Sequence, residues 1–435
     1  MPTGGGKSLC FELPALLVPG LTVVVSPLIA LMEDRVRQLK AKKIAADSLH
    51  SQQSKSQRLS VCSRLHKLKL IYVAPETLLS GSVWQKLLDP DLVIANIIID
   101  EAHCIEEWGT TFRPTYTRLG TVRDALQKLQ DSIITVAAFT ATADIATQQS
   151  IVRSLSLRQP QKYILNPYRD NIRLQLRRVF TIRGRKQAAL SFLRSKRSHY
   201  GLIYVATRKD SETLATWLQK QGFKTAAYHA GVPNTRKRQL EQQWLTGAIP
   251  FVVCTSAFGM GIDKPDVRWV LHYHLPQLLA QYLQEIGRSG RDGKSAIALG
   301  LVSEPTGWLD NTDKQRELFF TRQIQQKYSS AQKLLTQLPK EGNIRFITQE
   351  IPDSELALAI LSRYGSVQWL DPFNYRKTSK SNNEISSVIS SSQRISSFNR
   401  TKQCRWAYIL AAYNFPLPKP DFRCGKCDNC LRNVS

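Results

Sequence analysis

Short apolar runs recur along the chain as far as Leu301, and each is followed by a longer polar stretch of helical character. Such alternation is typical of βαβ units, in which helices cover buried parallel strands. A basic, turn-rich stretch around Asn166 to Arg185 divides the runs into two groups and predicts a linker. We therefore expect two tandem α/β domains, with strands at Thr22–Ser26, Leu70–Ala74, Val93–Asp100, Thr135–Thr140, Gly201–Ala206, Thr225–His229, Phe251–Thr255, Trp269–His272 and Ala296–Leu301.

After Val302 we expect the strands to stop and polar helical sequence to take over. This part contains an amphipathic segment, Ser354–Tyr364, and a Ser/Lys-rich tract, Lys377–Ser392. A chain of 435 residues is long enough for several domains. The predicted parts are two α/β domains at 1–165 and 166–310, a helical segment with the Ser/Lys-rich insertion at 311–395, and a cysteine-containing module at 396–435.

The charge is strongly basic, with 60 Lys and Arg against 34 Asp and Glu and a net charge of +26. Such a field favours a polyanionic partner, nucleic acid first, although a generally basic solvated surface is the alternative. No charged residue occurs between Leu13 and Met32, but three prolines and Gly20 interrupt that stretch. A helix, a strand and a second helix explain it better than a membrane span, so we expect no membrane partner.

A glycine-rich segment, Thr3-Gly4-Gly5-Gly6-Lys7-Ser8, opens the chain and leads into an apolar helix. Glycines let backbone N–H groups approach phosphates, the lysine reaches the β/γ oxygens, and the serine hydroxyl ligates Mg²⁺. The strict pattern has glycine at the position of Met1, and a glycine-rich tail is the alternative. The segment predicts a phosphate-binding loop for ATP.

Two adjacent carboxylates, Asp100 and Glu101, follow the predicted strand that begins at Val93. Ligands of α/β sheets bind at the carboxyl ends of strands. Asp100 is therefore predicted to hold Mg²⁺ and Glu101 to orient the attacking water. The alternative is an ordinary helix N-terminus, where carboxylates are common.

Phosphoryl transfer also needs positive charge at the γ-phosphate. The segment from Gln284 to Gly293 supplies Arg288 and Arg291, three positions apart, which we expect on one helical face. A surface ion pair is the alternative. Because the segment closes the second domain, we predict Gln284 and the two arginines as catalytic residues.

Together these blocks resemble the RecQ family of superfamily-two DNA helicases. The similar stretches are PTGGGKSLCFELPAL, VVSPLIALMEDRV, DEAHCIEEWGTTFRP, AFTATA, AYHAG, TSAFGMGIDKPDVRWVLHY and QEIGRSGRDG. The resemblance implies two RecA-like parallel-sheet motor domains, a small helical zinc-binding module, and ATP-driven 3′-to-5′ movement on DNA. It also implies roles for Thr140 and Thr142 in linking nucleotide to DNA, for Thr207 and Arg208 at a backbone phosphate, and for Asp263 near the ribose or the catalytic arginines.

The stretch from Cys104 to Arg113, directly after His103, is the part that resembles this family in particular. Trp108 and Phe112 could stack on bases, and Arg113 could add a phosphate or cation–π contact. The alternative is that both aromatics belong to the core. In the family this aromatic-rich loop couples single-strand binding to hydrolysis, so we predict DNA contact.

Four of the eight cysteines, Cys404, Cys424, Cys427 and Cys430, lie near the end of the chain. Three of them are spaced by two residues, a spacing that allows thiolates to surround a tetrahedral Zn²⁺. The family has a structural zinc site with this layout. An iron–sulfur cluster is the alternative for four cysteines.

The chain also departs from the family pattern. An upstream adenine-recognising segment and the strand that feeds the phosphate loop are not found before Thr3, and we expect a gap in the first sheet beside the strand carrying Asp100. We interpret Met1 as an internal position of a longer protein, and we expect no winged-helix or HRDC domain after the cysteines. Ser289 replaces the alanine usual between the two arginines, and a modest effect is expected.

Three functions follow as hypotheses. The first is an ATP-dependent DNA helicase, using ATP, Mg²⁺ and structural Zn²⁺, that acts as a monomer on single-stranded and partly duplex DNA, with single-strand-binding or recombination proteins as further candidate partners. The second is a catalytically inactive DNA-binding remnant, and the third is an RNA-directed relative. A bacterial cytoplasm, at the nucleoid, and a eukaryotic nucleus both fit.

Overall fold

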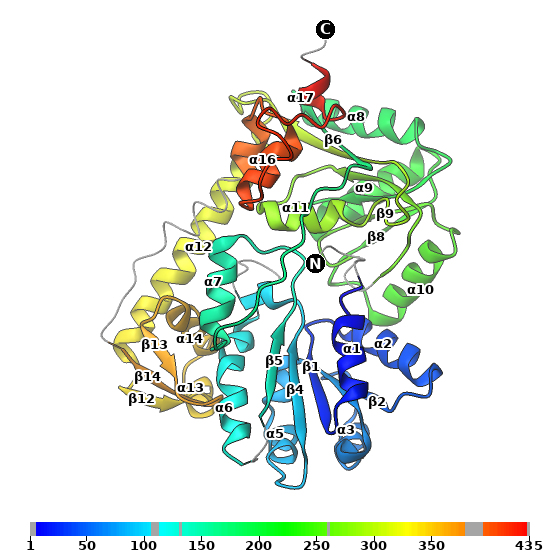
Figure 1. Cartoon of the computed structure of the whole chain (residues 1–435). Coiled ribbons are helices and arrows are strands. Elements are labelled where there is room, and N and C mark those ends of the chain that lie inside the picture. The colour runs from blue at the N-terminus through cyan, green and yellow to red at the C-terminus, as the bar shows by residue number, and fades with distance from the viewer. Residues whose placement is uncertain (1–5, 106–112, 130–132, 259–261, 379–394, 433–435) are drawn as a thin grey trace. The chain divides into compact units, whose positions relative to one another are not determined.

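A computed structural model of the chain describes residues 6–105, 113–129, 133–258, 262–378 and 395–432 (Figure 1). These residues form two compact units. The first contains the described residues up to Ile164 together with 323–378, and the second contains 165–322 together with 395–432. Each unit contains one large parallel sheet.

The first sheet has the strand order β2-β3-β1-β4-β5, and all its strands are parallel. Leu21, Val23 and Val25 of β1 pack in one apolar cluster, whereas Val24 packs in another on the opposite face. Burial on both faces explains why the central strands read as continuous β-branched runs. The strands are β1 (Leu21–Val25), β2 (Ala46–Leu49), β3 (Leu70–Val73), β4 (Ile94–Ile99) and β5 (Thr135–Ala138).

Helices cover this sheet and connect its strands, as expected for βαβ units. They are α1 (Leu9–Leu17), α2 (Ile29–Ala41), α3 (Lys55–Cys62), α4 (Pro75–Leu78), α5 (Gly81–Leu87), α6 (Val122–Gln127) and α7 (Ile145–Ser154), with short 3₁₀ helices η1 (Leu65–Lys67), η2 (Ala102–Ile105) and η3 (Pro114–Thr121). No helix within the described residues is both long and apolar enough to cross a membrane.

The prediction of a gap in the first sheet beside the strand carrying Asp100 is wrong. Strand β4 pairs with β1 on one side and with β5 on the other, where Asn96–Ile99 align with Thr135–Ala138. Because β5 fills that position, the edge of the sheet is β5 itself, whose residues are partly exposed (Figure 1).

The second sheet has the order β6-β11-β10-β7-β9-β8 and is also parallel. Gly201 lies in β7 against Trp269, where a Cβ would come within 2.1 Å of the indole ring. The strands are β6 (Ile172–Val179), β7 (Tyr200–Tyr204), β8 (Thr225–Tyr228), β9 (Phe251–Cys254), β10 (Val267–His272) and β11 (Ala296–Ser303), and the helices are α8 (Ile182–Arg194), α9 (Arg208–Lys220), α10 (Asn234–Leu245) and α11 (Leu279–Ile286).

The linker predicted around Asn166 to Arg185 is wrong, because it contains β6 and the start of α8. Strand β6 alternates between buried Ile172, Leu174 and Leu176 and the more exposed residues between them. An edge strand with one solvent-exposed face alternates between apolar and polar residues instead of forming an apolar run. The arginines on the exposed face led to the prediction of a loop.

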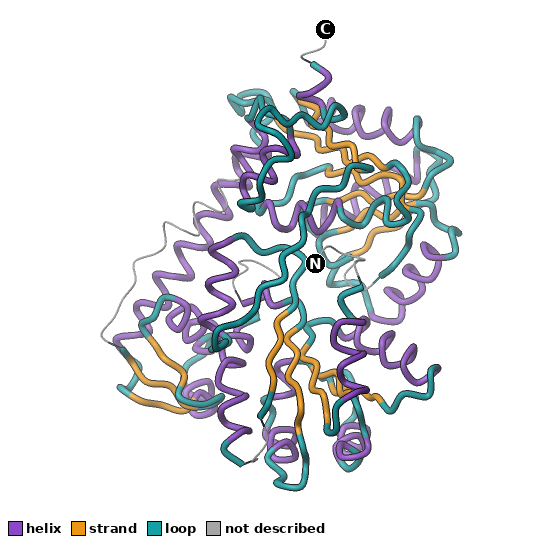
Figure 2. Tube along the Cα trace, viewed as in Figure 1, coloured by secondary structure: helices purple, strands orange, loops and turns teal. Residues whose placement is uncertain are grey.

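The expectation of purely helical sequence beyond Val302 is also wrong. After α12 (Thr312–Gln337) come β12 (Glu341–Asn343), α13 (Ile344–Glu350), α14 (Ser354–Arg363), β13 (Val367–Trp369) and β14 (Asn374–Lys377). The three strands form an antiparallel sheet in the order β12-β14-β13 (Figure 2). Helix–strand–helix–helix–strand–strand with this pairing is the arrangement of a winged-helix module. We call residues 323–378, which belong to the first unit, the inserted module.

The cysteine region packs on the second sheet through α16 (Arg405–Ala412) and α17 (Asp428–Leu431). The indole of Trp406 donates a hydrogen bond to the carbonyl of Ile172 at 3.1 Å, and its ring meets Tyr168 edge-on. The module is therefore anchored to the edge strand β6.

Candidate nucleotide, coupling and metal sites

The carboxyl ends of three neighbouring strands bring the predicted nucleotide residues together. Val25 of β1 aligns with Ile99 of β4, which in turn aligns with Ala138 of β5. The next residues along each strand therefore meet at one edge, and Ser26 Oγ lies 3.4 Å from Asp100 Oδ2. This edge is where α/β sheets bind ligands.

Lys7 reaches the same edge from the loop before α1. Its Nζ lies 3.0 Å from Glu101 Oε1 and 3.8 Å from Asp100 Oδ1. Gly6, just before it, has φ +76°, a conformation that favours glycine. Ser8 immediately precedes α1. Of the other predicted loop residues, Thr3, Gly4 and Gly5 lie outside the described part of the chain.

The electrostatics of this cluster suit a cation and a polyphosphate. Burial, together with the adjacent Glu101, raises the pKa of Asp100 to about 6, although Lys7 opposes the shift. Burial disfavours the charge on Lys7, but Glu101 and Asp100 outweigh it and raise the pKa of the lysine. Asp100 and Glu101 thus share one ammonium group. Their carboxylate oxygens are ligands of the kind that Mg²⁺ prefers.

A second set of contacts runs from Glu101 toward the next strand. His103 Nδ1 lies 3.3 Å from Glu101 Oε2 and 2.9 Å from Thr140 Oγ1. The backbone N–H of Thr142 donates to Thr140 Oγ1 at 3.3 Å. Glu101 has φ +48°, an uncommon conformation for a residue with a side chain, and such backbone strain clusters at functional sites. The structure therefore brings four predicted residues into one continuous chain of contacts.

Arg113 is held within the first unit rather than extended into solvent. One guanidinium nitrogen donates to the Pro27 carbonyl at 2.7 Å and another to Glu76 Oε1 at 3.1 Å. The predicted DNA-stacking residues Trp108 and Phe112 lie outside the described residues.

In the second unit, the expectation that Arg288 and Arg291 share a helical face is wrong. Helix α11 carries Gln284 but ends at Ile286, and Gly290 then adopts φ +58°. At Gly290 a Cβ would meet the Asn171 amide nitrogen at 2.5 Å, so only glycine fits at this position. The two arginines therefore lie in successive turns after the helix.

Asp263, predicted near the ribose or the catalytic arginines, forms an ion pair with Arg291, with Nη1 2.8 Å from Oδ1. Burial lowers the pKa of Arg291, an effect that Asp263 opposes. Arg288 is buried. Ser289 between them is fully buried, and its hydroxyl is satisfied by donation to the Ile286 carbonyl at 2.8 Å.

Thr207 and Arg208 begin helix α9. The Thr207 hydroxyl accepts from the Asp210 backbone N–H at 3.0 Å, while the Asp210 side chain accepts from the Thr207 N–H, which makes a capping box. Arg208 is exposed at this N-terminus. An exposed helix N-terminus with an arginine suits a phosphate, so the geometry is compatible with the predicted contact.

The four predicted metal ligands come together. The sulfurs of Cys404, Cys424, Cys427 and Cys430 all lie within 4.8 Å of one another, with separations of 3.9 Å for Cys424–Cys430 and 4.0 Å for Cys404–Cys427. Tetrahedral Zn–S bonds of about 2.3 Å place sulfurs about 3.8 Å apart. Backbone N–H groups of residues 405, 424 and 427 donate to these sulfurs, as they do to thiolates. The donor set fits a tetrahedral metal ion.

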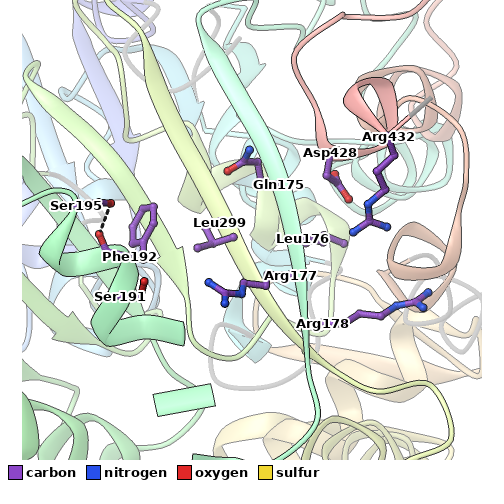
Figure 3. Close-up of a pocket in the computed structure, with 10 residues that line it drawn as sticks. All are labelled: Gln175, Leu176, Arg177, Arg178, Ser191, Phe192, Ser195, Leu299, Asp428 and Arg432. Atoms are coloured by element: carbon purple, nitrogen blue, oxygen red, sulfur yellow. Dashed lines mark hydrogen bonds between the residues drawn. The ribbon is translucent and has the colours of Figure 1, made fainter. Parts of the chain in front are cut away.

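A hollow on the second unit was not predicted from the sequence. It has a volume of about 570 Å³ and lies between β6, α8 and the end of α17 (Figure 3). Its lining includes two serines and three arginines: Ser191, Ser195, Arg177, Arg178 and Arg432. The signal in the sequence is a stretch without any Asp or Glu, from Asn171 to Lys209. The lining also includes the carboxylate of Asp428, and the Ser195 hydroxyl donates to the Phe192 carbonyl at 2.7 Å. Arg177 and Arg178 lie on opposite sides of β6, so the hollow does not present one converging set of donors (Figure 3).

Two family profiles match the chain. DEAD/DEAH box helicase matches residues 1–151, and Helicase conserved C-terminal domain matches residues 184–293. Among solved structures, yeast Dbp5 bound to RNA and ADP–BeF₃ superposes with a TM-score of 0.56 at 18% identity, covering 74% of this chain and 82% of that one. These similarities and the two sheets define a helicase with two RecA-like motor domains.

Relatives identify the family within that class. ATP-dependent DNA helicase RecQ from Synechocystis is 48% identical over 435 residues, which is 99% of this chain and 91% of the relative. RecQ from Haemophilus influenzae is 41% identical over 330 residues, covering 75% of this chain but 52% of that protein. The chain belongs to the RecQ family of ATP-dependent DNA helicases.

One buried histidine of the second unit, His274, accepts a hydrogen bond that requires a neutral ring. The Ala206 N–H donates to His274 Nδ1 at 3.2 Å, which fixes the acceptor nitrogen of a neutral ring. Burial, reinforced by Arg316 and Arg185, lowers the pKa of His274 well below its usual value. The unfolded chain therefore binds this proton more readily, and stability is lost as the pH falls below about 6.5.

We predict that His274→Asn, whose amide oxygen can accept the same N–H, reduces the loss of folding stability between pH 7.5 and 5.5. The histidine contribution is up to about 1.4 kcal/mol per pH unit below its unfolded pKa. Thermal unfolding midpoints at both pH values measure it, with exposed His66→Asn as control. Equal acid sensitivity in wild type and His274→Asn would contradict the prediction.

Proposed function

We propose that the protein moves 3′-to-5′ along single-stranded DNA and unwinds partly duplex DNA in recombination, repair or replication. The observation that carries the proposal is the chain of contacts from Lys7 through Glu101 and His103 to Thr140. These contacts join the lysine proposed to bind phosphate to Thr140, which lies just after the carboxyl end of β5. We also propose a bacterial cytoplasm, at the nucleoid, as the location, with a eukaryotic nucleus as the alternative, and a monomer as the working form.

In this proposal Lys7 and Ser8 bind the phosphates and their magnesium ion, and Asp100 is the carboxylate ligand. Mg²⁺, when bound, neutralises charge that develops on the phosphoryl oxygens. Glu101 orients the attacking water, because its carboxylate lies beside Lys7 at the same strand end.

The second motor domain contributes the remaining nucleotide groups. Gln284, Arg288 and Arg291 supply polar and positive groups to the phosphates, and Asp263 holds Arg291 ready within 2.8 Å. His103, Thr140 and Thr142 couple the nucleotide site at Glu101 to the DNA-binding residues. Trp108, Phe112, Arg113, Thr207 and Arg208 contact the DNA strand.

We predict that Lys7→Ala lowers DNA-stimulated ATP turnover by about 10²- to 10³-fold, the usual cost of removing one group that stabilises transition-state charge. Steady-state hydrolysis with and without single-stranded DNA measures the effect, with exposed Lys42→Ala as control. DNA binding without turnover in the wild type would favour the second hypothesis, an inactive DNA-binding protein.

We further propose that the four cysteines hold a structural Zn²⁺, since four thiolates leave no open position for water. Removing it is expected to lower the unfolding midpoint, because metal binding contributes to folding. Elemental analysis should find one zinc per chain in the wild type and none in Cys424→Ser, with Cys10→Ser as control. Iron and sulfide in the purified protein would instead indicate an iron–sulfur cluster.

A further inference from the structure

The inserted module packs on the first motor domain through the two elements that a winged helix normally offers to a ligand. Helix α14, its third helix, lies against η3. Phe373, in the turn between β13 and β14, meets the Trp84 ring edge-on at 5.6 Å and packs on the core of the first sheet. The helix and the turn therefore face protein.

At the centre of this contact, Glu355 of α14 accepts two hydrogen bonds from η3. Arg118 Nη2 lies 2.6 Å from Glu355 Oε1, and Thr115 Oγ1 lies 3.2 Å from the same oxygen. Arg118 also donates to the Pro372 carbonyl at 3.4 Å and lies over the Trp369 ring at 5.9 Å. One arginine of the motor domain is thus surrounded by the inserted module.

Burial makes this arrangement costly to break. The Arg118 side chain is only 9% exposed. Burial lowers the pKa of Arg118, and Glu355 opposes that shift. The Glu355 side chain itself is 41% exposed, so the burial penalty falls mainly on Arg118, whose guanidinium would lose its nearest carboxylate partner if Glu355 were removed.

The same short helix contacts the nucleotide site. Tyr116 of η3 is fully buried, and its hydroxyl donates to the backbone carbonyl of Asp100 at 3.0 Å. Arg113, just before η3, is bound to Pro27 and Glu76. A continuous set of contacts thus runs from Glu355 through η3 to the residue predicted to hold Mg²⁺.

We propose that Glu355 is a positioning residue for η3, through which the inserted module sets how strongly DNA stimulates ATP turnover. The inference rests on the proposed DNA-stimulated ATPase. Because η3 contacts Asp100 on one side and the module on the other, loosening its outer contact weakens coupling between DNA and nucleotide while the nucleotide residues themselves stay in place.

The test compares Glu355→Gln with Glu350→Gln, an exposed carboxylate of α13 in the same module. We expect Glu355→Gln to leave DNA-independent hydrolysis unchanged and to lower the stimulation by DNA about 2- to 30-fold, the range for substitutions that alter coupling between sites. Tyr116→Phe, which removes one hydroxyl at the other end of η3, should act in the same direction. Glu350→Gln should behave as wild type.

Hydrogen exchange of the backbone amides of residues 114–121 gives a readout that does not depend on catalysis. Faster exchange in Glu355→Gln, together with reduced stimulation, supports the inference. Unchanged stimulation, with or without faster exchange, overturns it, because the contact would then only support the fold. Absence of DNA stimulation in the wild type would instead refute the proposed function, and unchanged exchange in that case would also refute the positioning role.

Discussion

The parallel register of β1, β4 and β5 is the constraint on which the rest of the nucleotide site depends. Ile99 lies between Val25 and Ala138, so the residues that follow these strands meet at one edge. Backbone pairing of these strands, of which β1 is buried on both faces and β5 is partly exposed, thus fixes the positions of charged groups that repel one another. The cost of gathering carboxylates there appears in the raised pKa of Asp100, and Lys7 offsets part of it.

The sequence was most informative where burial was complete. Runs of β-branched residues predicted central strands of the sheets. Asp100 and Glu101 were predicted at the carboxyl end of one of these strands, and Lys7 was predicted from the glycine-rich loop before an apolar helix. Prediction failed where strands were polar or had one solvent-exposed face. Strand β6 alternates arginines with buried residues, and β2 contains Asp47, whose charge is satisfied by Lys40 and Arg64. Neither strand has an apolar run, so neither was predicted.

Local geometry and long-range packing were beyond the reach of pattern reasoning. The spacing of Arg288 and Arg291 suggested a shared helical face, but Gly290 turns the chain after α11 ends. The inserted module has strands of three and four residues, too short to show a period. Its docking joins Arg118 to Glu355 across 237 positions, and no local signal specifies such a pair. The sequence pattern did predict the carboxylates Asp100 and Glu101 at the end of a strand.

The central claim is that Glu101, His103 and Thr140 act as one coupled unit at the edge of the first sheet. A double-mutant cycle with His103→Ala, Thr140→Val and the combined variant tests it, with the DNA-stimulated turnover number as the readout. We expect the effects of the two single substitutions on turnover not to add, with a coupling energy of about 0.5–3 kcal/mol, as for residues in direct contact. Effects that add within about 0.3–0.5 kcal/mol, as for independent sites, would contradict it.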